Sequence, residues 1–108
     1  MTILIIGSTE YRSRMNDHAG KLEEQGHTVL IPEFDDGNLD SLGIVTNNRE
    51  LIRMADEIHM FWNGRSQGTW CDFCMAFALE KPIKLVYLEE KSFRKTVKEY
   101  CHQDDTLA

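Results

Sequence analysis

A polar loop and the acid that follows it are the part of this chain that could do chemistry. The loop reads Asn63-Gly64-Arg65-Ser66-Gln67-Gly68-Thr69 and lies between an apolar run and a segment with helical spacing. Ser66, Gly68 and Thr69 therefore fall at an expected helix N-terminus, where unpaired amides and the helix dipole favour an anion such as phosphate or carboxylate. The same residues also suit an ordinary helix cap, because serine and threonine are common there.

Asp72 follows Thr69 by three residues, in the first turn of the expected helix. It could complete a capping box, although that place usually holds Glu or Gln. It could also act as a nucleophile or an acid–base group, since catalysis needs such a group fixed on a rigid element. A second glycine loop, at Gly7 and Ser8, follows the first apolar run. The two loops together predict a binding site with Asp72 at its mouth.

Apolar runs alternate with segments of helical spacing along the whole chain. We expect strands at 3–6, 28–31, 58–62 and 83–88, and helices at 11–25, from Asn47 or Asn48 to 55, at 69–79 and at 92–100. This alternation predicts an α/β fold, a flavodoxin-like three-layer sandwich with a parallel sheet of four or five strands. With strand order 2-1-3-4(-5), both glycine loops meet at the topological switch point, where ligands bind in such sheets.

Size and charge restrict the classes of function that are open to the chain. Its 108 residues fit one domain, which we expect at 1–101, followed by a flexible tail at 102–108. A net charge of −6 argues against binding to nucleic acid backbones. No apolar run approaches the roughly 20 residues that span a bilayer. The chain starts without the basic segment of a signal peptide and has three cysteines, so we expect a cytoplasmic protein without membrane partners.

Several short motifs spread over most of the chain carry a resemblance to a known family. They are Gly7-Ser8 after the first strand, residues 22–29 with Pro32, Ala55-Asp56-Glu57-Ile58, and Ser66-x-Gly68-Thr69-x-x-Asp72-x-x-x-Ala76 followed by Lys81-Pro82-Ile83. Together they resemble the nucleoside 2-deoxyribosyltransferase-like family. The resemblance implies cleavage or transfer at the N-glycosidic bond of a deoxynucleoside or its monophosphate. It implies no metal and no organic cofactor, and it implies a homo-oligomer.

The resemblance also assigns a role to the acid of the loop. In the family, a Glu at this position attacks the anomeric carbon of the sugar, so the resemblance makes Asp72 the catalytic nucleophile. Asp is one methylene shorter, and a displacement of about 1 Å can cost on the order of a hundredfold in rate. A second acid would assist the departing base, with Glu10, Asp35 and Asp36 as candidates. The residues expected to bind substrate are Gly7, Ser8, Arg12, Asn63, Ser66, Gly68 and Thr69.

Two other functions stay open at this point. A nucleotide-binding or sensing protein without catalysis would explain why Asp stands where the family has Glu. A thiol–disulfide protein is the second alternative, because Cys71 and Cys74 form a Cys-x-x-Cys pair at a helix N-terminus. The chain lacks the downstream proline of thioredoxins, since its last proline is Pro82. A zinc site that adds Cys101 and His102 is weaker still, because adjacent ligands are not a usual spacing.

Overall fold

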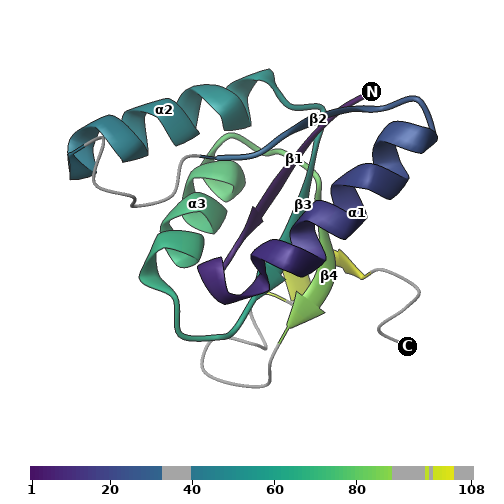
Figure 1. The fold of residues 1–108 in the computed structure, drawn as a ribbon. Coiled ribbons are helices and arrows are strands. Elements are labelled where there is room, and N and C mark those ends of the chain that lie inside the picture. Colours follow the sequence, from purple (N-terminus) through teal and green to yellow (C-terminus); the bar gives the residue numbers. More distant parts are fainter. Residues whose placement is uncertain (33–39, 89–96, 98, 104–108) are drawn as a thin grey trace.

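The computed structural model describes residues 1–32, 40–88, 97 and 99–103. Its centre is a sheet of five parallel strands in the order β2-β1-β3-β4-β5 (Figure 1). The strands are β1 Thr2–Gly7, β2 Thr28–Leu30, β3 Glu57–Trp62, β4 Ile83–Leu88 and β5 His102–Gln103. The predicted class, strand order and parallel pairing are confirmed.

Helices cover both faces of the sheet and complete three layers. A short 3-10 turn, η1 Thr9–Tyr11, leads into α1 Arg12–Glu24 on one side, and α2 Ser41–Met54 and α3 Gln67–Ala78 lie on the other (Figure 1). Successive side chains of β1 alternate between the two cores: Leu4 and Ile6 pack with α2 and α3, whereas Ile3 and Ile5 pack with α1. Burial on both faces explains why β1 is a continuous apolar run. Among the described residues, no helix is long and apolar enough to cross a membrane.

Helix α2 begins earlier than the sequence predicted, and this changes the functional site. Asp40, not Asn47 or Asn48, is its N-cap, and the Asp40 carboxylate accepts a hydrogen bond from the Gly43 amide at 2.7 Å. Gly43 and the β-branched residues after it are poor helix formers, but the cap and the packing of the helix outweigh that propensity. Asn48 therefore lies in the middle of the helix, where it is only 5% exposed.

The C-terminal part differs from expectation as well. His102 and Gln103 pair with Lys84 and Leu85 as the edge strand β5, where the sequence analysis placed the start of a tail. Two residues are too few to show strand periodicity in a sequence, and the pairing comes from the neighbouring strand. Of the helix expected at 92–100, the described residues 97, 99 and 100 are helical. The rest of that helix, residues 104–108 and the candidate acids at 35 and 36 lie outside the described residues.

Candidate functional site

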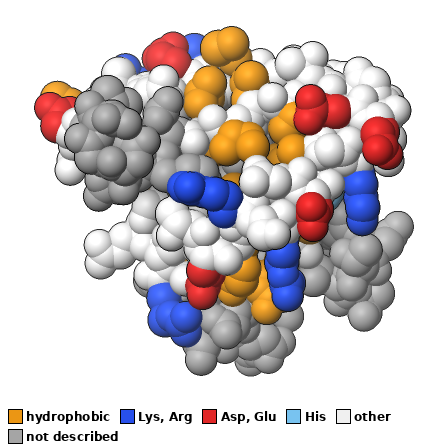
Figure 2. Space-filling model, in the orientation of Figure 1, with side chains coloured by type: hydrophobic (Ala, Val, Ile, Leu, Met, Phe, Trp, Pro, Cys, Tyr) orange, Lys and Arg blue, Asp and Glu red, His pale blue; other side chains and the backbone are white. Residues whose placement is uncertain are grey.

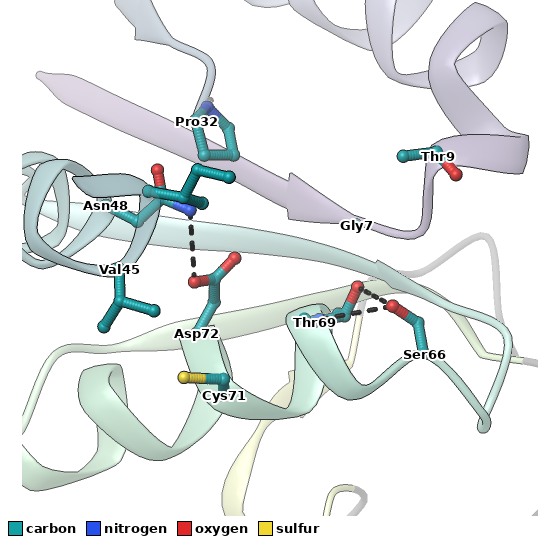
Figure 3. A pocket seen from close by; sticks show the side chains of 11 residues that line it. Gly7, Thr9, Pro32, Val45, Asn48, Ser66, Thr69, Cys71 and Asp72 are labelled. Carbon is teal, nitrogen blue, oxygen red and sulfur yellow. Dashed lines mark hydrogen bonds between the residues drawn. The ribbon is translucent and has the colours of Figure 1, made fainter. Parts of the chain in front are cut away.

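A hollow of about 240 Å³ lies where the carboxyl ends of β1 and β3 meet the start of α3. The segments that line it come from both glycine loops, from the end of β2 and from α2 (Figure 3). They contribute Gly7, Thr9, Pro32, Ile44, Val45, Asn48, Ser66, Gly68, Thr69, Cys71 and Asp72. The sheet topology therefore brings together five of the eight residues that the sequence analysis selected.

Asp72 is the charged group of this lining, and it is nearly buried. Its side chain is directed into the hollow (Figure 3), and the residue is 8% exposed. Burial raises the pKa of Asp72 from 3.8 to about 7, although a hydrogen bond from Asn48 lowers it in part. Such a carboxyl group can be a nucleophile when ionised and a proton donor when neutral. Perturbed carboxyl groups in clefts are typical of functional sites.

Asn48 is the residue of the hollow that sequence reasoning missed. Its amide nitrogen donates to Oδ1 of Asp72 at 3.5 Å, across the gap between α2 and α3. Its amide oxygen accepts a hydrogen bond from Asn47, also at 3.5 Å. Asn48 follows Ile44 by four residues and precedes Ile52 by four, so helical spacing places it on the apolar face of α2. An asparagine on the apolar face of a helix would have indicated a functional role for Asn48. The sequence analysis missed it because it began this helix at Asn47 or Asn48.

The start of α3 is both a helix cap and a wall of the hollow. Ser66 is the N-cap, and its hydroxyl oxygen accepts from the Thr69 amide at 3.3 Å and from the Thr69 hydroxyl at 3.2 Å. The Ser66 carbonyl accepts a hydrogen bond from the Trp62 indole at 3.1 Å, and Trp62 stacks on Trp70 with ring centroids 5.5 Å apart. The capping interpretation is therefore confirmed, and the same side chains border the hollow (Figure 3).

Gly7 and Gly68, the two glycines of the lining, differ in how much space surrounds the position of a Cβ atom. A Cβ on Gly7 would lie 2.8 Å from the Met15 sulfur and 2.8 Å from the Phe61 carbonyl oxygen, so close packing between β1, β3 and α1 requires glycine. A Cβ on Gly68 would have no neighbour nearer than the Ser66 hydroxyl, at 4.0 Å. Packing therefore does not require glycine at Gly68, where a side chain would extend into space beside the hollow.

Ser8 and Asn63, expected to bind substrate, hold the two loops to each other instead. Ser8 is 2% exposed, and its hydroxyl accepts a hydrogen bond from the Asn63 amide at 3.2 Å. The side-chain oxygen of Asn63 accepts from the amides of Arg65 and Ser66, both at 2.8 Å. These bonds position the loop that carries Ser66, but neither residue is part of the lining.

Two further charged candidates also lie outside the hollow. Arg12 is exposed at the start of α1 and is not part of the lining. Glu10 accepts a hydrogen bond from the Asn63 side chain at 2.6 Å and lies 3.9 Å from the Arg65 guanidinium. Spacing in the sequence could place these residues near the loops but could not show whether their side chains line the hollow. Assistance to the departing base by Glu10 stays a prediction.

The cysteine pair does not have the electrostatics of a redox site. Cys71 lines the hollow, and burial together with the nearby Asp72 and Cys74 raises its thiol pKa. Burial also raises the pKa of Cys74, which is exposed on the helix surface. Redox-active cysteines at helix N-termini have lowered pKa values, whereas burial shifts the pKa values of Cys71 and Cys74 in the opposite direction. Within the described part of the chain, no group of three or more His, Cys, Asp or Glu residues could hold a metal ion.

Comparison with known proteins finds a solved structure of similar fold. No protein-family model matches the chain, and no curated protein matches it. A solved structure, the CMP N-glycosidase BcmB of Clostridium botulinum, superposes with a TM-score of 0.72 at 18% sequence identity. The match covers 96% of this chain and 86% of that chain. At this identity, the likeness shows that the two proteins share an α/β three-layer fold.

Proposed function

We propose that this protein cleaves or transfers the N-glycosidic bond of a nucleoside or nucleoside monophosphate, with Asp72 as the nucleophile. The observation that carries the proposal is a nearly buried carboxyl group in a hollow at the switch point of the sheet. Asp72 is also the residue to which the resemblance assigns the nucleophile. The shared fold with a CMP N-glycosidase supports the same reaction class.

The reaction proceeds in two steps with this arrangement of groups. The ionised Asp72 attacks the anomeric carbon of the sugar, and the bond to the base nitrogen breaks with its electron pair leaving on the base. A proton from solvent water neutralises the departing base, and the nucleophile of the second step returns one proton to solvent. Water, or the nitrogen of another base, attacks the same carbon and releases the carboxylate, which gives hydrolysis or transfer. Asn48 fixes the carboxylate by donating to Oδ1, which leaves Oδ2 as the attacking oxygen.

The polarity of the lining supports one orientation of the substrate. Thr69 and its hydroxyl lie on one side of Asp72, whereas Val45 lies on the other (Figure 3). Sugar or phosphate oxygens would lie at the hydroxyl end, near Thr9 and Ser66, because hydroxyl groups can donate to them and the Thr69 hydroxyl already donates to Ser66. The base would lie against Pro32 and Val45, since an apolar wall favours a planar ring over water.

The test is release of free base, measured by chromatography. The native protein is incubated with each ribonucleoside and deoxynucleoside and with each 5′-monophosphate. We expect base from at least one of them, a loss of at least about a hundredfold in Asp72→Asn, and no change in Glu24→Gln, an exposed control on α1. Base release by Asp72→Asn at the native rate would overturn the role of Asp72.

A binding protein without turnover is the second candidate, and one observation favours it. Burial raises the pKa of Asp72 to about 7, so the neutral form, which cannot act as a nucleophile, is populated at neutral pH. Thermal stabilisation by a nucleotide, with no base released from any substrate, would support this candidate and contradict the enzyme.

We also propose that the protein forms a homo-oligomer through the outer face of α3. Trp70, Phe73, Cys74, Phe77 and Tyr100 surround an apolar hollow of about 220 Å³ there, and Phe77 is 54% exposed. Exposed aromatic clusters of this kind are typical of interfaces. Light scattering during size-exclusion chromatography should give a multiple of 12.5 kDa for the native protein. A reduced mass is expected for Phe77→Ser, and a native mass of one chain would contradict the proposal.

A further inference from the structure

A third and larger hollow lies on the opposite side of the sheet from the hollow at Asp72. This groove, of about 410 Å³, is lined by α1 and its C-cap, Gln25, together with one side chain each from β3 and β4. Its residues are Arg14, Asp17, His18, Lys21, Leu22, Gln25, Phe61 and Val86. It shares no lining residue with the hollow at Asp72, so the two are separate sites.

Three basic side chains lie on one stripe of α1 along this groove. Arg14, His18 and Lys21 are four and three residues apart, a spacing that brings side chains to the same face of a helix. The Arg14 guanidinium lies 4.7 Å from the centroid of the Tyr87 ring and 5.9 Å from that of Tyr11. These contacts hold the arginine in place, which reduces the entropy lost when it binds a ligand.

His18 is held just as firmly, by a chain of hydrogen bonds into the sheet. Its Nε2 lies 2.8 Å from Nδ1 of His59, and Nε2 of His59 lies 2.7 Å from the Glu57 carboxylate. His59 is 3% exposed, so this chain is largely shielded from water. When His59 donates to Glu57, its other nitrogen accepts the proton of His18. The two bonds fix the position of the His18 ring beside Arg14 and Lys21 in the groove.

The surroundings of the groove combine positive charge with an apolar floor. Arg14 and Lys21 outweigh the one acid of the lining, Asp17, in a protein with a net charge of −6. On the face of the molecule shown in Figure 2, Lys and Arg side chains are interspersed with Asp and Glu. Phe61 and Val86 supply the floor, and the Phe61 ring meets His18 edge to face at 5.5 Å.

We propose that this groove binds an organic anion, with a phosphate or carboxylate at the stripe of Arg14, His18 and Lys21 and an apolar body on Phe61 and Val86. Guanidinium and ammonium groups donate charge-assisted hydrogen bonds to such anions. The apolar floor distinguishes an organic anion from an inorganic one, because only the former removes this surface from water.

The test uses four probes: phenyl phosphate, benzoate, inorganic phosphate and benzyl alcohol. Binding is followed by NMR chemical-shift changes of backbone amides and by calorimetry. We expect phenyl phosphate or benzoate to bind about tenfold more tightly than inorganic phosphate and benzyl alcohol, with shifts centred on Arg14, Lys21 and Val86. Phenyl phosphate and benzoate distinguish a phosphate site from a carboxylate site.

Variants decide whether the groove is responsible. Arg14→Gln should weaken binding about tenfold, and Lys21→Gln should weaken it in the same direction, because each removes a charge-assisted hydrogen bond. Arg53→Gln, which removes a half-exposed arginine of α2, should change nothing. Asp72→Asn should leave the affinity unchanged, since that residue lines the other hollow. Shifts centred on Gly68 and Thr69, native affinity in Arg14→Gln, or no binding of any probe at millimolar concentration would overturn the proposal.

Discussion

Replacement of Asp72 by asparagine should make the protein more stable above neutral pH. Burial raises the pKa of this carboxyl group from 3.8 to about 7, a difference of about three pKa units. Each unit corresponds to about 1.4 kcal/mol, so the ionised form costs on the order of 4 kcal/mol in the folded state. A raised acid pKa stabilises the fold below about pH 4, and this contribution is lost as the pH rises through about 7. Asparagine has nearly the same shape and does not ionise.

The assay is urea unfolding followed by circular dichroism, at intervals between about pH 4 and pH 9. Native protein and Asp72→Asn should have similar free energies of unfolding near pH 4. The free energy of unfolding of Asp72→Asn, relative to that of the native protein, should increase steadily up to about pH 7. At higher pH the variant should remain more stable by up to about 4 kcal/mol. Glu24→Gln, an exposed control, should show no such gain. A difference between native protein and Asp72→Asn that does not vary with pH would refute the reasoning.

The remaining predictions concern the walls of the hollow. Asn48→Ala removes the hydrogen bond that lowers the Asp72 pKa. The midpoint of the pH–rate profile for base release should therefore move above about 7. An unchanged midpoint would contradict this prediction. Gly7→Ala should lower the free energy of unfolding by about 1–3 kcal/mol, because its Cβ would overlap the Phe61 carbonyl. Gly68→Ala should instead raise the free energy of unfolding by up to about 1 kcal/mol, because the site has room for a Cβ and alanine favours the helix. Equal losses of stability in the two glycine variants would show that the close contact at Gly7 is unimportant.

The sequence predicted the sheet well because buried parallel strands have a simple pattern. Strand β4 was predicted with its observed bounds, Ile83–Leu88, and β3 differs by one residue at its start. Such strands are apolar on both faces, so a short unbroken apolar run between turn residues identifies them. The alternation of strands and helices then sets the switch point, and with it the position of the hollow.

The site was harder to predict because it depends on the directions of side chains. Helical spacing placed Asp72 in the first turn of α3 and left the cap open between Ser66 and Thr69, and all three residues line the hollow. Asn48 depends on where α2 begins, and that start is set by the Asp40 cap and by packing rather than by helix propensity. The hydroxyl of Ser8 is directed to the Asn63 amide rather than into the hollow, which no linear pattern shows.

The stacking of the indole rings at the start of α3 gives the protein an optical signal of its own. The chain has two tryptophans, and these are the stacked pair Trp62 and Trp70. One of them donates to the Ser66 carbonyl, in the loop that borders the hollow. Tryptophan fluorescence therefore arises beside the loop that borders the hollow, and a ligand that moves this loop will change the emission without any label attached.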